Sequence, residues 1–409
     1  MPGNRPVTAI VFEGGQPLHP LAVPMMAVRT SVTLDTLQKL LHVPEIEQVV
    51  VCSDRADVVE GARRLGAIVE EQPPGPFHFG RWLQDVVQRR AREGVLYLGG
   101  ASAPLMTRAD FAAAASLLTW GGPRVVANNP QSPDLVGFYP AGLIQSVQAP
   151  PTDNALGLAL RDLDVERILV PVSYRASFDL DTPTDLLIYR EILRATPGGA
   201  QPQRRVGAAG GLSAAVAPRG NQLRADASAA TRALLESLDW NPPRWDEALR
   251  QLSRPFADVA LIGRVGAPLI AHLNETYSLR LRVFSEERGM KALGREERGE
   301  VRTLLGAYIE DVGPRRFFER LAEVADVAVI DTRPLVSHGG RKVSEADRFA
   351  SDLGMVESIK DPGVRDLASA AADLRALPTI LGGHSLVSGG LSALLLARVR
   401  QRQQSKAEV

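Results

Sequence analysis

Charged and polar side chains collect after three apolar runs in the second half of the chain, at residues 279–284, 327–331 and 378–381. Together they supply carboxylates, guanidinium groups, hydroxyls and imidazoles, which can bind a phosphorylated or carboxylated small molecule. The same residue types also form surface ion pairs, which need no ligand and contribute ~0–1 kcal/mol each. The candidate pocket residues are Ser285, Glu286, Glu287, Arg288, Asp331, Arg333, His338, Asp347, Arg348, Gly383, His384 and Ser385.

A glycine-rich loop at 382–385 follows the last of these runs. Backbone N–H groups at the start of the next expected helix, together with His384 and Ser385, could hold a phosphate or a carboxylate. The alternative is a glycine-rich turn in which Ser385 caps the helix. A serine-hydrolase elbow does not fit, because Val387 stands where the second glycine of G-x-S-x-G belongs.

Two glycine pairs, at 14–15 and 99–100, follow expected strands in the first half of the chain. Glycine lets the backbone approach a ligand and turn its N–H groups toward it, so these pairs predict a nucleotide or phosphate cradle, with a tight turn as the alternative. Nearby polar residues could contact a base or a sugar, or could simply stabilise turns. The candidate nucleotide-binding residues are Gly14, Gly15, Gly99, Gly100, Ser102, Asn128, Asn129 and Asp134.

The segment FDLDTPTDL offers two interpretations. Asp179 and Asp181 end an expected strand and could hold a cation. The segment also has the pattern of a helix start, with Thr182 as N-cap, Pro183 at the first helical position and Asp185 completing a capping box.

These residues depend on the elements that position them. In the first half, short apolar runs alternate with helical patterns, which predicts an α/β fold with a mostly parallel, Rossmann-like sheet and helices on both faces. In such sheets ligands bind beyond the carboxyl ends of the strands. The expected strands are 7–12, 49–52, 94–100, 124–128, 135–140 and 167–172, and the expected helices are 29–42, 57–65, 79–92 and 107–118.

The second half is helix-rich, with the three apolar runs as its only expected strands, and we expect a mixed α/β domain there. A Gly-, Ala-, Pro- and Arg-rich stretch without acidic residues separates the two halves, which is typical of a linker. The sequence therefore predicts domains at 1–195 and 226–409, joined by a linker at 196–225. The expected helices of the second half are 227–238, 244–257, 299–312, 315–325, 364–376 and 386–400.

The order of motifs over residues 7–193 resembles the MobA-like nucleotidyltransferase superfamily. The strand with its glycine pair, LHPLAVPMMAV, VVVCSD, VLYLGGASAPLMT and FDLDTPTDL follow in that order. The resemblance implies a GT-A-like domain that transfers a nucleoside monophosphate from a nucleoside triphosphate, with Mg²⁺ and release of pyrophosphate.

The same comparison implies an altered active site. Gln16, Pro17 and Leu18 follow the glycine pair, and His19 stands where the family has a basic residue. No Lys or Arg occurs between residues 5 and 29, although transfer relies on cations to stabilise developing charge. Ser102 replaces the family's metal-binding aspartate, and a hydroxyl is a poor Mg²⁺ ligand. Mg²⁺ is thus implied by the family and disfavoured by this sequence.

Composition narrows the remaining classes of function. The 409 residues carry 47 basic and 47 acidic side chains, so no overall field attracts nucleic acid or an anionic membrane. The single cysteine argues against a disulfide framework. Neither a signal peptide nor a membrane span is expected, so the expected location is the cytoplasm.

Two hypotheses follow. In the first, the protein binds a nucleotide or nucleotide-sugar and, if active, transfers a nucleotidyl group to a small phosphorylated acceptor. In the second, the N-terminal domain is a catalytically degenerate scaffold, and the C-terminal domain binds or acts on a phosphorylated or carboxylated metabolite.

Overall fold

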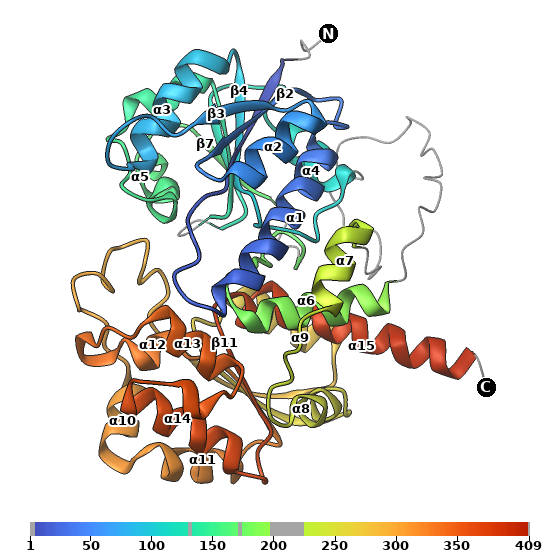
Figure 1. Ribbon diagram of the computed structural model, residues 1–409, viewed down its shortest axis with the longest axis vertical. Helices are drawn as coiled ribbons and strands as arrows, with labels where there is room; N and C mark the ends of the chain where they lie inside the picture. The colour runs from blue at the N-terminus through green and yellow to red at the C-terminus, as the bar shows by residue number, and fades with distance from the viewer. Residues whose placement is uncertain (1–4, 130–132, 171–173, 197–224, 408–409) are drawn as a thin grey trace. The chain divides into compact units, whose positions relative to one another are not determined.

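The computed structural model describes residues 5–129, 133–170, 174–196 and 225–407, in which strands are separated mostly by single helices or by groups of helices (Figure 1). The chain forms two compact units, and each is built from three segments. The first unit contains Met1–Gln16, Val28–Ala176 and Thr196–Ala233, and the second contains Pro17–Ala27, Ser177–Ala195 and Leu234–Val409.

The first unit contains a seven-stranded sheet in the order β3-β2-β1-β4-β6-β5-β7. Its first four strands are parallel, β6 runs antiparallel to both of its neighbours, and β5 and β7 are parallel to each other. The strands are β1 (Val7–Phe12), β2 (Ile46–Ser53), β3 (Ile68–Glu71), β4 (Gly94–Gly99), β5 (Arg124–Ala127), β6 (Leu135–Tyr139) and β7 (Glu166–Leu169).

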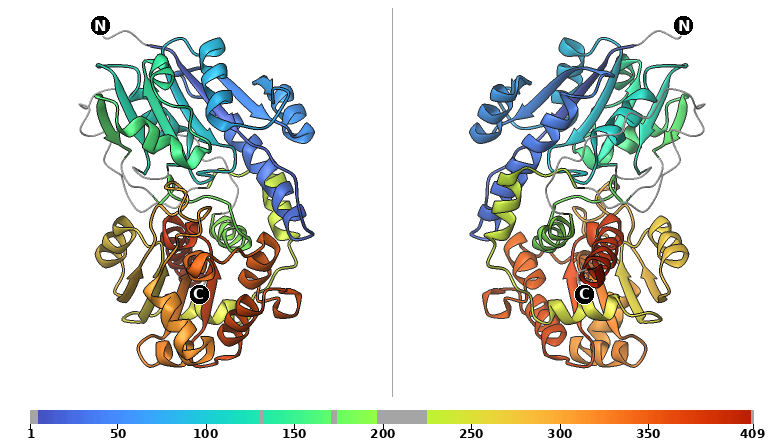
Figure 2. Two further views of the ribbon diagram at one scale, coloured as in Figure 1. Left: turned by 90° about the vertical axis from the view of Figure 1, so that its left-hand side faces the viewer. Right: turned by 90° about the vertical axis from the view of Figure 1, so that its right-hand side faces the viewer.

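Side chains alternate across this sheet, so one strand supplies two cores. Val7, Ala9 and Val11 of β1 face the core under α1, α2 and α4, whereas Ile10 faces the core under α3, η1 and α5. Helices therefore cover both faces, as Figures 1 and 2 show. These helices are α1 (Ala22–Leu40), α2 (Ala56–Leu65), α3 (Phe79–Arg90), α4 (Arg108–Ser116), η1 (Ala141–Ser146), η2 (Asp153–Ala155) and α5 (Leu156–Arg161).

The second unit contains a four-stranded sheet in the order β11-β10-β8-β9, and all of its strand pairs are parallel. If β8 to β11 are numbered 1 to 4 and the sheet is read from the β9 edge, the order is 2-1-3-4, as in flavodoxin-like sheets. In such sheets the direction of winding reverses between strands 1 and 3. That reversal lies here between β8 and β10. The strands are β8 (Asp258–Gly263), β9 (Arg280–Ser285), β10 (Val327–Asp331) and β11 (Thr379–Gly382).

Helices pack around this sheet as well (Figure 2). One core joins alternate residues of β8 and β10 to α10, α11, α12, α13 and α14, while α8 contacts β10 and β11, and α15 contacts α6 and α9. The helices are α6 (Pro183–Ala195), α7 (Ala229–Glu236, shared between the units), α8 (Trp245–Leu252), α9 (Ala267–Thr276), α10 (Leu304–Val312), α11 (Pro314–Ala322), α12 (Arg333–Val336), α13 (Glu345–Asp352), α14 (Pro362–Asp373) and α15 (Gly389–Ala407). Short 3₁₀ turns lie at His338–Gly340, Val356–Ser358 and Ser385–Val387.

The predicted α/β class is confirmed, and most expected elements occur within a few residues of their predicted ends. Three differences matter for the site. The strands β3 and β8 were not predicted, and α6 belongs to the second unit although the sequence groups residues 1–195 together. The division into domains stays a prediction. Of the expected linker 196–225, residues 197–224 lie outside the described residues, as do residues 171 and 172 of the strand expected at 167–172.

Candidate functional site

The glycine pairs of the first unit lie side by side at the carboxyl ends of two neighbouring strands. β1 and β4 are paired along their whole length, so the loop with Gly14 and Gly15 lies beside the loop with Gly99, Gly100 and Ser102. The order β3-β2-β1-β4 is that of a Rossmann half, and the two loops flank its switch point, where dinucleotide-binding sheets place their ligand. The structure thus brings these predicted residues together.

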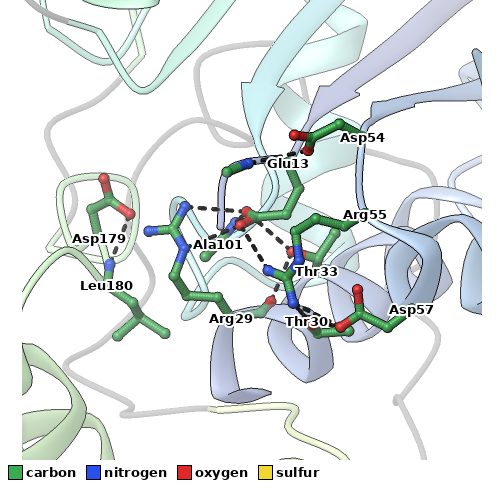
Figure 3. A network of polar contacts seen from close by, with 11 residues as sticks. Glu13, Arg29, Thr30, Thr33, Asp54, Arg55, Asp57, Ala101, Asp179 and Leu180 are labelled. Atoms are coloured by element: carbon green, nitrogen blue, oxygen red, sulfur yellow. Dashed lines mark hydrogen bonds and ion pairs between the residues drawn. The ribbon is translucent and has the colours of Figure 1, made fainter. Parts of the chain in front are cut away.

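A buried carboxylate occupies this switch point (Figure 3). The Glu13 side chain is fully buried and receives two hydrogen bonds from Arg29, from Nε at 3.1 Å and from Nη2 at 3.2 Å. The backbone N–H of Ala101 donates at 3.2 Å, and the hydroxyl of Thr33, which also donates to the carbonyl of Arg29 at 2.8 Å, lies 3.4 Å from the carboxylate. Nη1 of Arg55 lies 3.7 Å from Oε1. The carboxylate therefore faces two cations and a loop amide.

A second carboxylate accepts a hydrogen bond from a backbone N–H of the loop that contains Gly14 and Gly15. The N–H of Gly15 donates to Oδ1 of Asp54 at 3.1 Å, and a Cβ on Gly14 would lie 2.8 Å from the same oxygen. The sequence predicted a shortage of positive charge around this loop. The structure differs, because Arg29 and Arg55 reach the site from α1 and from the end of β2, and carboxylates of the chain engage both.

These residues do not fit Mg²⁺. The buried carboxylate of Glu13 faces guanidinium groups, which repel a divalent cation, and Ser102 offers only a hydroxyl. Within the residues that the structure describes, no group of three or more His, Cys, Asp or Glu side chains could hold a metal ion.

Two of the remaining nucleotide-binding candidates, Asn128 and Asp134, stabilise a turn. Asn128 accepts hydrogen bonds from the backbone N–H groups of Asp134 and Leu135, and its amide donates to the Asp134 carboxylate and to the carbonyl of Ala176. This is the alternative that the sequence left open. Asn129 lies next to this turn.

The second unit places an ion pair at its own switch point. Asp331 ends β10, Arg264 directly follows β8, and Nε and Nη2 of Arg264 donate to the two carboxylate oxygens at 2.6 and 3.1 Å. Asp331 is 0% exposed and Arg264 is 8% exposed. Gly263 has a φ of 111°, and a Cβ there would lie 2.5 Å from Cβ of Asp331. Only glycine allows this close approach without strain.

The ion pair keeps both groups charged. Burial alone would raise the pKa of Asp331, but the adjacent Arg264 holds it below its usual value. Burial alone would lower the pKa of Arg264, but Asp331 raises it. The pair is therefore a fixed, oriented feature of the edge, because breaking it would leave an uncompensated buried charge.

Further cations surround this pair. Arg333 is held by Glu296 through two hydrogen bonds of 2.8 Å. Within the described part of the chain, the side chains of Arg288 and Lys291 have neither an ion pair nor a hydrogen bond. Burial and then the charge of Arg264 lower the pKa of Arg288, and burial and then the charge of Arg333 lower that of Lys291.

An imidazole completes the cluster. His384 follows β11, and its Nδ1 is buried without a hydrogen-bond partner among the residues that the structure describes. Burial, followed by the charge of Arg264, lowers the pKa of His384 to about 4 although Asp331 opposes the shift. His384 is therefore neutral at pH 7 and can donate through one ring nitrogen while accepting through the other.

The other predicted residues of the C-terminal pocket make structural contacts. Glu286 accepts the N–H groups of Leu304 and Leu305 at the start of α10, and the Asp347 carboxylate accepts those of Lys360 and Asp361. Among the remaining five, Ser285 donates to the carbonyl of Val265, and Arg348 donates to the carbonyl of Val343. Glu287 accepts from the Arg295 side chain and from the N–H of Arg302. His338 accepts the N–H of Thr303, and Ser385 accepts the N–H of Asp179.

The segment FDLDTPTDL forms the capping box of α6. The Asp185 carboxylate accepts from the N–H and hydroxyl of Thr182, and the N–H of Asp185 donates back to that hydroxyl. A Cβ on Gly383 would lie 2.6 Å from Cγ2 of Thr182, so the cap packs against the loop after β11. The carboxylate of Asp181 is close enough to oppose the lowering of the pKa of Lys291 and of His384, and Asp179 accepts the N–H of Leu180.

Sequence reasoning missed Glu13, Arg29, Arg55, Arg264, Lys291 and Glu296. Glu13 and Arg264 each come directly after a strand, which is the available signal. Arg29 and Arg55 lie inside or before helices and carry no such signal.

No protein-family model matches the chain, and no curated protein sequence matches it. Solved structures similar to it include a nucleotidyl transferase from Methanothermobacter, at 15% identity over 48% of this chain and 100% of the other, with a TM-score of 0.39. A 4-diphosphocytidyl-2C-methyl-D-erythritol synthase from Anaerococcus prevotii is 13% identical over 47% and 97%, with a TM-score of 0.36. A glucosyl-3-phosphoglycerate synthase from Mycobacterium tuberculosis, in complex with Mn²⁺ and uridine diphosphate, is 13% identical over 40% and 69%, with a TM-score of 0.31. Among the described residues, no helix has the length and apolar content needed to cross a membrane.

Proposed function

We propose that the protein binds a phosphorylated or carboxylated small molecule at the carboxyl edge of the second sheet. The observation that carries this proposal is the excess of cations there. Arg288 and Lys291 lie near the Arg264–Asp331 pair without a carboxylate partner among the described residues, and burial and neighbouring cations lower the pKa of both. A bound anion relieves that repulsion.

The surrounding groups suit such a ligand. The guanidinium of Arg288 lies against the start of α9, since its Nη1 is 2.5 Å from where a Cβ on Gly266 would be. A cation at the positive end of a helix is unfavourable by itself, whereas an anion between the two is attracted by both. The neutral imidazole of His384 adds a donor and an acceptor.

Binding is tested on the full-length chain by thermal shift and calorimetry with inorganic phosphate, a sugar phosphate and a small dicarboxylate. The double variant Arg288→Gln/Lys291→Gln should bind at least about 100-fold more weakly, because hydrogen bonds to charged groups contribute ~1.5–3 kcal/mol each and two of them are lost. Arg320→Gln is the matched control, because Arg320 is an exposed arginine of the same unit that pairs with Glu323. Equal binding by all three proteins, or binding by none, would contradict the proposal.

Nucleotidyl transfer in the first unit is the second candidate, favoured by its strand order and by the glycine loops at its switch point. The test is release of pyrophosphate from each nucleoside triphosphate with Mg²⁺. Deleting residues 1–200 would not separate the two candidates, because α6 belongs to the second unit. Point variants of Arg288 and Lys291 leave the first unit intact and are the better comparison.

A further inference from the structure

Glu13 lies among several groups of the first unit that can donate hydrogen bonds to an anion. Its carboxylate is buried, and the groups that face it are two guanidinium groups, one hydroxyl and one loop N–H. The amide belongs to Ala101, in the loop after β4. These donors come from three separate stretches of the chain, namely α1, the segment after β2 and the loop after β4, and converge on one carboxylate.

The same donor set is what binds a phosphate group. Arginine forks match the oxygens of phosphate and carboxylate alike, and backbone N–H groups of glycine loops complete such sites. The loop is shaped around the side chain, because a Cβ on Gly100 would lie 2.8 Å from Oε2 of Glu13 and 2.5 Å from Oγ1 of Thr33. Asp54 takes the neighbouring N–H of Gly15 in the same way.

We propose that Glu13 is a built-in anion that occupies the phosphate position at the switch point of the first unit. The wild-type chain therefore holds no free phosphate at Arg29 and Ala101, and shortening Glu13 turns this position into a site for phosphate or a small carboxylate. This inference is independent of the anion site proposed in the second unit.

The test is chemical rescue of Glu13→Ala in the full-length chain. The variant should unfold at a lower temperature than the wild type, because Arg29 and Arg55 lose their shared carboxylate. Inorganic phosphate or acetate should restore at least half of that loss in a saturable way. For each anion, the rise in melting temperature of the variant is compared with the rise in the wild type. Both measurements are repeated with Arg288→Gln/Lys291→Gln present, which removes binding in the second unit.

Two controls make the result specific. Glu70→Ala removes another buried carboxylate of the first unit that pairs with two arginines, Arg89 and Arg90, both at 2.6 Å, but that lies on β3 away from the glycine loops. Glu13→Gln keeps the space filled. Neither control should be rescued.

If Glu13→Ala does not fold in plain buffer, the same anions should allow it to fold. Rescue that is absent, or equal to that of Glu70→Ala, would reduce Glu13 to an ordinary structural ion pair. The proposal would also be overturned if the Arg288→Gln/Lys291→Gln protein, with Glu13 intact, were stabilised by phosphate in a saturable way and the further change Arg29→Gln abolished that response.

Discussion

Arg264 and Asp331 join β8 and β10 through a two-point ion pair, with Nε–Oδ2 and Nη2–Oδ1 distances of 2.6 and 3.1 Å. Asp331 is fully buried, so removing its carboxylate leaves the buried guanidinium of Arg264 without its partner beside other cations. Asp331→Ala should therefore lower the free energy of unfolding by about 3–5 kcal/mol, the usual cost of breaking a buried pair. Urea denaturation measures this change.

An exposed pair in the same unit provides the control. Asp258 pairs with Arg280 and Arg282 at the surface, where solvent screens the charges. Asp258→Asn should change the free energy of unfolding by no more than about 1 kcal/mol. Equal losses in the two variants would show that the Arg264–Asp331 pair has no special place in this sheet.

His384 makes the stability of the fold depend on pH. Its pKa is about 4 in the folded chain and about 6.5 for an ordinary histidine, so the unfolded chain binds the proton first as the pH falls. The contribution of this residue is present above pH 6.5 and is lost as the pH falls toward 4. From pH 7 to pH 5 the wild type should lose about 2 kcal/mol more than His384→Gln.

Denaturant midpoints at the two pH values measure that difference, and NMR of the imidazole follows the pKa directly. Saturating phosphate should raise the pKa of His384, because an adjacent anion favours the protonated ring. A ring that titrates near pH 6.5 without ligand would show that burial does not control this residue.

The strand β8 explains why the sequence predicted only part of the second site. DVALIG was not predicted as a strand because a helical pattern over 244–257 runs up to it, and α8 in fact ends at Leu252. With β8 missing, neither the switch point nor Arg264 could be placed. Asp331 and His384 were identified because their strands were predicted, which shows that strand ends carry the signal.

Contacts between distant segments could not be predicted in the first unit either. Glu13 was visible as the residue after β1, but its role depends on Arg29 and Arg55, which reach it from other elements. The capping box of Thr182 and Asp185 was predictable because both partners lie within one turn of helix. Contacts between residues close in sequence can therefore be predicted from sequence, whereas contacts between side chains of distant segments require the fold.

Asp352 is a buried carboxyl group that favours the neutral form. Burial and then the charge of Asp185 raise its pKa well above the usual value, although Arg348 opposes the shift. It lines a cavity with Trp245 and Ser351, and Asp352 Oδ1, Ser351 Oγ and Trp245 Nε1 are buried without a partner in the described part of the chain. Keeping this group neutral costs free energy above its unfolded pKa.

Asp352→Asn should therefore be stabilising at pH 7, by roughly 2–4 °C in melting temperature if about 1 kcal/mol is recovered. As the pH rises above about 4, the wild type should lose stability relative to the variant, because only the wild type holds an acid whose pKa is raised by folding. Asp366→Asn, an exposed change on α14, should alter neither. A destabilised Asp352→Asn with the same pH dependence would contradict this account.

Close packing requires glycine at position 100 in the first unit. A Cβ at this position would lie 2.5 Å from Oγ1 of Thr33 and 2.8 Å from Oε2 of Glu13, so Gly100→Ala must displace a buried polar network. We expect a loss of about 1–3 kcal/mol, as for other overpacked sites. At Gly142 a Cβ meets nothing within 4 Å and the backbone is not left-handed, so Gly142→Ala should be neutral or stabilising by about 0.4–1 kcal/mol. Denaturant unfolding of both variants measures these changes.

The combination of Gly100→Ala with Glu13→Ala should lower the free energy of unfolding by less than the sum of the two single changes, because the shorter side chain at position 13 removes one of the clashes. Strict additivity would mean that the Glu13 carboxylate is not what requires glycine at position 100, which would leave the contacts with Oγ1 of Thr33 and with Cβ of Glu13, at 2.8 Å, as the reason.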